Sequence, residues 1–241
     1  MLEKRVRKKI VLFIMIFSTF IGIMNTNAYA GGFTNEVTRN NSYDRNKATW
    51  YAENYAAWPG NPEYYNYGSI ATGGDCTNFV SQVLKYGGMS MKGYPNPGDG
   101  TYASWYYKGA SIPNRSYSWT SAHWFRYYWA NVNNEGYNKA YRYTVYTVDS
   151  AIENFEQIYS ELWRGDVVQY VDKSNGKTTH SQVIHAYVND IDTGKHLYVA
   201  QHSTTYDRFM KYEDLKQYLL RKQARDEGGD WFVTIQIKQG L

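Results

Sequence analysis

The residue of this sequence best suited to chemistry is Cys76, its only cysteine. In an exported protein, which normally pairs its cysteines, an unpaired one is either a small apolar filler or a reactive thiol. Asp75 and Thr77 are residue types that begin helices, and Phe79 and Val80 follow at helical spacing. Cys76 is therefore predicted in the first turn of a helix, where free backbone N–H groups and the helix dipole stabilise a thiolate.

A nucleophilic cysteine needs a histidine to carry its proton and a third group to orient that histidine. His180 opens a predicted strand and His202 ends the next one, so the two could be neighbours in an antiparallel hairpin. We expect His180 on the sheet face toward the cysteine helix, with His202 behind it. His185 has the opposite strand parity and should not take part. His196 is predicted in a turn and His123 in an aromatic helix.

A zinc site is an alternative use of the same side chains, since Cys76, His180, His185 and His202 could all be ligands. No pair of them has the close spacing of a familiar zinc motif. Two acidic residues are expected to have structural and not chemical roles. Asp75 is predicted to cap the helix, and Asp166 to be a hydrogen-bonding turn residue.

The segments that position these residues predict an α+β fold, because helices come first and an antiparallel sheet follows. Residues 31–41 are predicted to be frayed and residues 89–118 irregular. Predicted helices cover about 43–57 (capped by Ser42 or Asp44), 75–86, 120–133, 148–162 and 212–222. Predicted strands cover about 141–148, 166–171, 181–189, 196–203 and 231–238.

The first thirty residues have the pattern of a signal peptide. A basic head is followed by an apolar run over 10–24 and by Ala28-Tyr29-Ala30, a small-x-small cleavage signal. We therefore expect a signal peptide at 1–30 and a single catalytic domain at 31–241, with a long aromatic-rich segment at 89–160. An uncleaved membrane anchor is the alternative.

Removal of the signal peptide also changes the charge of the chain. The full sequence has 26 basic and 22 acidic residues, and the first thirty residues hold five of the basic and one of the acidic ones. The mature chain has 21 of each, which gives no argument for a nucleic-acid partner or for stable membrane insertion. The 26 tyrosines and 8 tryptophans could fill a core or line a groove.

Several motifs occur in an order that resembles a known family, the Putative amidase domain family of Gram-positive bacteria. That family is related to the NlpC/P60 and CHAP cysteine peptidases, the papain-like group that cuts cell-wall peptides. The resemblance extends over most of residues 43–205. Its motifs are Gly74-Asp75-Cys76-Thr77-Asn78-Phe79-Val80-Ser81-Gln82, Gly165-Asp166-Val167-Val168-Gln169-Tyr170, His180-Ser181, and Ala200-Gln201-His202-Ser203, with Tyr43-Asp44-Arg45, Ala48, Tyr51, Ala52 and Tyr55 upstream.

The resemblance implies a papain-like α+β domain that hydrolyses an amide bond of the cell-wall peptide without a cofactor. Carried over by position, it implies Cys76 as nucleophile, His180 as base and His202 as the third polar residue. One departure is Thr77-Asn78, where better-known relatives have Ser-Gly after the cysteine. The alternatives are an inactive wall- or glycan-binding module, a transacylase, and a secreted peptidase that acts on protein.

Overall fold

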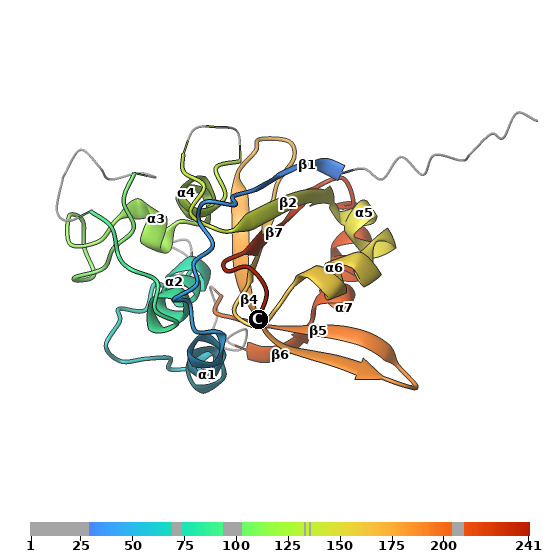
Figure 1. The fold of residues 1–241 in the computed structure, drawn as a ribbon, viewed down its shortest axis with the longest axis horizontal. Coiled ribbons are helices and arrows are strands. Elements are labelled where there is room, and N and C mark those ends of the chain that lie inside the picture. The colour runs from blue at the N-terminus through green and yellow to red at the C-terminus, as the bar shows by residue number, and fades with distance from the viewer. Residues whose placement is uncertain (1–28, 69–73, 94–102, 133, 135, 204–209) are drawn as a thin grey trace, which may run out of the picture.

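A computed structural model describes residues 29–68, 74–93, 103–132, 134, 136–203 and 210–241 (Figure 1). The predicted signal peptide lies outside the described residues except for its last two positions. The described residues form an α+β fold around an antiparallel sheet of seven strands, in the order β1-β2-β7-β3-β4-β5-β6. The fold class predicted from the order of elements is therefore confirmed at this level.

The sheet contains the five strands predicted from sequence and two that were not. The unpredicted strand β1 lies in the segment expected to be frayed, and β6 lies at the start of the last predicted helix. Both are edge strands, so their pairing partners, and not their own weak alternation, give them their structure. The strands are β1 (Tyr29–Thr34), β2 (Arg142–Thr147), β3 (Val167–Val171), β4 (Thr178–Asp190), β5 (Gly194–Gln201), β6 (Met210–Asp214) and β7 (Trp231–Gln236).

The helices are α1 (Arg45–Tyr55), α2 (Cys76–Tyr86), α3 (Tyr117–Thr120), α4 (Ala122–Trp129), α5 (Val148–Glu153), α6 (Phe155–Glu161) and α7 (Leu215–Gln223). Four helices, α1, α2, α4 and α7, agree with predicted ones apart from their ends, whereas α3 begins in the segment that was predicted to be irregular. Asp44 caps α1 through a hydrogen bond from the Lys47 backbone N–H, 3.0 Å. The predicted helix over 148–162 is two helices, separated at Asn154. Within the described parts of the chain, no helix is long and apolar enough to cross a membrane.

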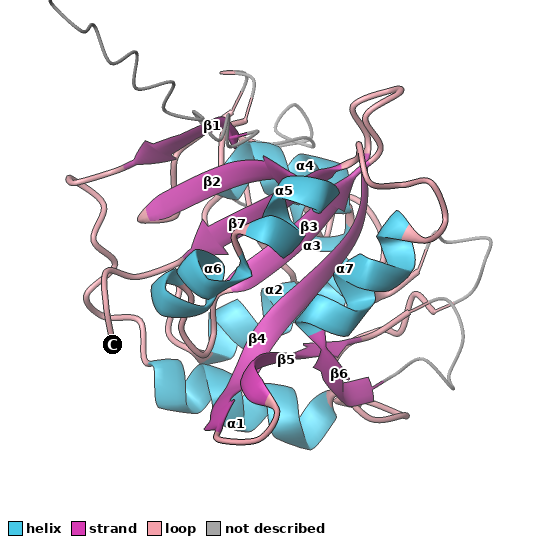
Figure 2. Cartoon of the chain, turned by 90° about the vertical axis from the view of Figure 1, so that its right-hand side faces the viewer, coloured by secondary structure: helices cyan, strands magenta, loops and turns pink. Residues whose placement is uncertain are grey.

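The sheet has helices on both faces, and each face has its own apolar core (Figures 1 and 2). Helices α1, α2 and α4 pack on one face, against residues such as Val167 and Val183. Helices α5, α6 and α7 pack on the other face, against Val168 and Ile184, the residues that follow Val167 and Val183 in their strands. Successive residues of one strand therefore enter different cores, as the two-residue period of a strand requires.

A buried ion pair fixes α1 against the sheet. The Arg45 guanidinium donates to Asp166 Oδ1 at 2.8 Å, and both side chains are almost fully buried. Arg45 also donates to the backbone carbonyl oxygens of Arg164 and Lys238, while Asp166 accepts from the Ile237 N–H. Asp166 thus has a structural position, as the sequence suggested, and it holds the start of β3 in place.

Candidate active site

Cys76 is the first residue of α2, and its side chain is buried. The His180 ring and the backbone N–H of Ser181 face its sulfur as potential hydrogen-bond donors, and the Thr77 hydroxyl lies 3.7 Å from it. Asp75 precedes the helix, but its carboxylate makes no capping bond to the helix backbone. The sulfur therefore stands at a helix start and is surrounded by hydrogen-bond donors, an environment that favours a thiolate.

The strand edge beside Cys76 explains how both His180 and the Ser181 N–H reach one sulfur. Within the described residues, pairing between β4 and β5 begins at Val183↔Ala200, so the edge of β4 at His180 and Ser181 is not covered by β5. The helix start occupies this open edge. On its other side, β4 has a register irregularity near His180, at the Tyr170/Val171 step of β3.

His180 lies on the opposite sheet face from the one we predicted. Its ring stacks with those of Tyr170 and Tyr218, at centroid distances of 6.2 and 6.4 Å, and Tyr218 belongs to α7. The ring nevertheless contacts the sulfur because the edge of β4 is open there. The sequence shows which strand carries the histidine, but it does not show that the neighbouring strand separates at that point.

The pKa values of the two groups shift toward an ion pair. Burial alone would raise the pKa of the Cys76 thiol, but the positive charge of His180 and its hydrogen bond outweigh burial and bring the pKa below its ordinary value of 9.0. Burial alone would lower the pKa of His180, but the negative charge of Cys76 raises it above 6.5. The arrangement therefore favours a thiolate beside an imidazolium.

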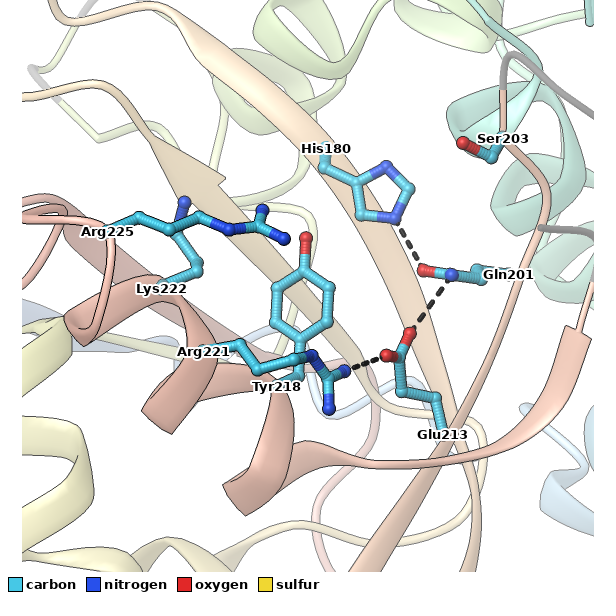
Figure 3. Close-up of a pocket in the computed structure, with 8 residues that line it drawn as sticks. All are labelled: His180, Gln201, Ser203, Glu213, Tyr218, Arg221, Lys222 and Arg225. Atoms are coloured by element: carbon cyan, nitrogen blue, oxygen red, sulfur yellow. Dashed lines mark hydrogen bonds and ion pairs between the residues drawn. The ribbon is translucent and has the colours of Figure 1, made fainter.

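The third polar residue is Gln201, at the end of β5 (Figure 3). Its amide nitrogen donates to Glu213 at 3.0 Å, and its carbonyl oxygen lies 2.7 Å from His180 Nε2. Glu213 is paired in turn with Arg221. A carboxylate can only accept, so Glu213 fixes the orientation of the Gln201 amide. Because the amide oxygen faces His180, Nε2 carries the hydrogen, and Nδ1 is left to face the sulfur.

His202 does not lie behind His180, so its predicted position was wrong. The register pairs Val183 with Ala200, which places Gln201 on the face of His180 and turns His202 to the other face. There His202 stacks on Phe79, with ring centroids 4.2 Å apart. The predicted strand was right, but the predicted residue was one position too late.

His202 instead forms a buried pair with Asp75. Its Nδ1 lies 2.6 Å from the Asp75 carboxylate, and its Nε2 lies 2.7 Å from the backbone oxygen of Tyr55. Both contacts are made by oxygen atoms, so both ring nitrogens of His202 are engaged. Asp75 also accepts from the Tyr67 backbone N–H at 2.9 Å and from Asn78 at 2.8 Å. This cluster fixes the chain segment from which Cys76 begins.

The other histidines lie away from the sulfur. His185 faces α1, with Nδ1 3.5 Å from Glu53, and accepts from the Tyr212 N–H. His196 lies 2.6 Å from Asp214 near the surface. Among the described residues, no three side chains of the types His, Cys, Asp and Glu converge as a metal site would require. Of the four candidate zinc ligands, Cys76 and His180 lie together, whereas His185 and His202 have other partners.

Two cavities meet the site, one at Cys76 and one at His180. The first, which we call the aromatic pocket, has a volume of about 410 Å³ and is lined by Tyr65, Tyr67, Cys76, Arg115, Tyr117 and Thr179, among others. The second, the basic pocket, has a volume of about 480 Å³ and is lined by His180, Gln201, Glu213, Tyr218, Arg221 and Arg225, among others (Figure 3). The sulfur opens to the first cavity and the histidine to the second.

The aromatic-rich segment contributes to both core and cavity. Trp105 and Trp119 are fully buried, and the Trp119 ring nitrogen donates to Asn78 at 2.8 Å.

The side chains of Thr77 and Asn78 both make contacts outside α2. The Thr77 hydroxyl is hydrogen-bonded to the Ser181 hydroxyl at 3.0 Å. The Thr77-Asn78 pair that departs from the better-known pattern therefore ties α2 to the sheet and to the aromatic-rich segment.

A model of the family described as Putative amidase domain matches residues 42–225, about three quarters of the chain. The chain belongs to this family. The matched range contains Cys76, His180 and Gln201, and it ends at Arg225 of the basic pocket.

One curated relative is the uncharacterized protein YhbB of Bacillus subtilis (strain 168), which is 36% identical over 180 residues. The aligned part is 73% of this chain and 47% of the relative, so the chain spans about half the length of the relative it matches. No solved structure gives a significant match.

Proposed function

We propose that this chain is an exported cysteine amidase that hydrolyses an amide bond in the peptide part of the bacterial cell wall. The observation that carries the proposal is the contact of Cys76 with His180, in which each group shifts the pKa of the other toward the ionised pair. An ionised cysteine–histidine pair is the nucleophile of acyl-transfer enzymes. Membership of an amidase family supports an amide as substrate.

The first half of the reaction forms an acyl-thioenzyme. The Cys76 thiolate attacks the amide carbonyl carbon, and the carbonyl oxygen takes the negative charge of the tetrahedral intermediate. The backbone N–H of Cys76, at the start of α2, is one candidate donor to that oxygen. The His180 imidazolium then gives its Nδ1 proton to the leaving nitrogen, the C–N bond breaks, and the amine departs.

The second half returns the enzyme to its starting state. His180 is now neutral and takes a proton from water, whose oxygen attacks the thioester carbon. The C–S bond breaks, the acid is released, and the sulfur leaves as a thiolate beside the imidazolium. Through both steps Gln201 holds Nε2–H, so the proton is exchanged at Nδ1, the nitrogen that faces the sulfur.

The arrangement of elements supports a papain-like fold for this domain. A cysteine begins a helix, the helix packs on an antiparallel sheet, and a central strand carries the histidine. Export and the wall substrate rest on the signal-peptide pattern and on the family resemblance. Cleavage after Ala30 would leave Gly31–Thr34 paired with β2, so the edge strand would survive removal of the leader.

Purified residues 31–241 incubated with cell-wall material test the proposal. We expect new amino groups to appear and no new reducing sugar ends, because thiol chemistry acts on carbonyl groups and glycosidic cleavage uses paired carboxylates. Mass spectrometry of the released fragments then identifies the bond.

The matched control is Cys76→Ala, which removes only the sulfur. Release of amino groups by the wild-type domain and none by the variant supports the proposal. Equal release by both proteins, or none by either from wall, peptide or protein substrates, would contradict it and favour a binding module.

A further inference from the structure

We infer that the basic pocket binds a carboxylate on the leaving-group side of the scissile amide, with Arg225 as its principal ligand. The inference rests on the proposed function and specifies its substrate class. The amine released would belong to an amino acid or peptide that carries a free carboxylate close to the cleaved bond.

The two pockets would hold different parts of the substrate, because one contains Cys76 and the other contains His180. Cys76 lines the aromatic pocket and keeps the acyl part of the substrate as a thioester. His180 lines the basic pocket and gives its proton to the departing amine. The part of the substrate that leaves with the amine therefore lies toward the basic pocket.

The cations of the basic pocket are not equivalent. Lys222 is paired with Glu227 and Asp230, and Arg221 is paired with Glu213. Arg225 lies just beyond the end of α7, in a turn that its backbone N–H closes on the Lys222 carbonyl at 3.0 Å. Among the described residues it makes no ion pair.

The surroundings of Arg225 also suit an anion. Its side chain is exposed and points into the pocket, where Tyr218 presents its hydroxyl (Figure 3). Burial and the negative charge of Glu213 raise the pKa of Tyr218, so the hydroxyl keeps its proton and can donate. A guanidinium without an ion-pair partner and a phenol donor form a site that one carboxylate would neutralise.

Binding to the Cys76→Ala variant tests the inference without turnover. The probes are soluble stem peptides from Gram-positive wall, and the same peptides after carbodiimide coupling of their carboxylates to methylamine. Isothermal titration calorimetry should show that the carboxylate form binds about 10-fold or more tightly than the amide form. Adding Arg225→Gln should remove that difference.

Lys216→Gln is the matched control, because Lys216 lies exposed on α7 above the Phe155 ring and does not line the pocket. This variant should keep the full preference for the carboxylate form, and all variants should melt at the same temperature. Equal binding of the two peptide forms, an undiminished preference after Arg225→Gln, or no binding of either form would overturn the inference. Failure of the proposed function would show separately, as wall cleavage that does not depend on Cys76 or does not occur.

Discussion

His180 and His202 lie on neighbouring strand ends, yet their surroundings give them opposite roles. His180 has one nitrogen held by the neutral amide of Gln201 and the other free to face the sulfur. His202 has both nitrogens bound, one by the Asp75 carboxylate and one by the Tyr55 carbonyl. A histidine that exchanges a proton needs one nitrogen available, so only His180 is arranged for chemistry.

The hydrogen-bond partners of a histidine, and not its distance from the cysteine along the chain, therefore decide whether it can exchange a proton. The stronger electrostatic partner belongs to His202, which is fixed by a buried carboxylate. His180 has the weaker, neutral partner, which orients its ring while its charge depends on the sulfur.

The largest effect is expected for His180→Gln. Without the imidazole no group gives a proton to the leaving amine, so the rate of amide cleavage should fall by about 1,000-fold or more. The free energy of unfolding should change little, because His180 is only partly buried. Amino-group release from wall material and denaturant unfolding measure the two effects. Retention of more than a tenth of the activity would contradict the assignment of His180 as the proton carrier.

His202→Gln should damage the fold instead. The change leaves the buried Asp75 carboxylate without its histidine partner, so the free energy of unfolding should fall by about 3 kcal/mol. Activity should fall less than in His180→Gln at temperatures where the variant is folded. Urea unfolding compared with turnover of the folded fraction separates the two losses. A fully stable but inactive variant would mean that His202 acts directly in the reaction.

Gln201→Leu tests whether the neutral partner of His180 orients its ring. The leucine removes the acceptor of Nε2–H, so the ring loses its fixed orientation and kcat should fall by about 10- to 100-fold. The pH profile of thiol alkylation should shift as well, which a purely structural role would not cause. Gln201→Glu keeps an acceptor toward His180 but places a second carboxylate beside Glu213. An unchanged kcat in Gln201→Leu would show that the ring is held by stacking alone.

His196→Gln should have the smallest effect. His196 is bonded to Asp214 near the surface, far from the sulfur, and such pairs contribute about 1 kcal/mol or less. Activity should stay within about two-fold of wild type, because the bond orients no reacting group. The same two assays measure it. A large loss of activity would show that β5 transmits changes from this pair, near its start, to Gln201 at its end.

Much of the fold was predictable because strong local patterns determine it. The start of α2 follows from Asp75 and Thr77 around the cysteine, and the helical spacing after them is regular. The central strands are apolar and β-branched, so β3, β4 and β7 stand out. Prediction failed at the edges of the sheet, where β1 and β6 depend on their pairing partners.

The candidate site was harder to predict because it depends on register. The order of motifs led to the correct strand pair, but a register that pairs Val183 with Ala200 selects Gln201 in place of His202. Strand parity applied to both strands together could have identified Gln201. Glu213 could not be found, since it lies on the unpredicted strand β6.

The central claim is that His180 activates the Cys76 thiol, and the pH dependence of alkylation tests it most directly. Cys76 is the only cysteine, so iodoacetamide incorporation measured by mass spectrometry reports on one sulfur. In the wild-type domain the rate should rise through a midpoint below 9.0 and remain high as pH increases, because the thiolate is the reactive form and the positive charge of His180 stabilises it. In His180→Gln the charge and the hydrogen bond of His180 are lost while burial still raises the pKa of the thiol, so the midpoint should move to higher pH. A wild-type midpoint at or above 9.0, or the same midpoint in both proteins, would contradict the account.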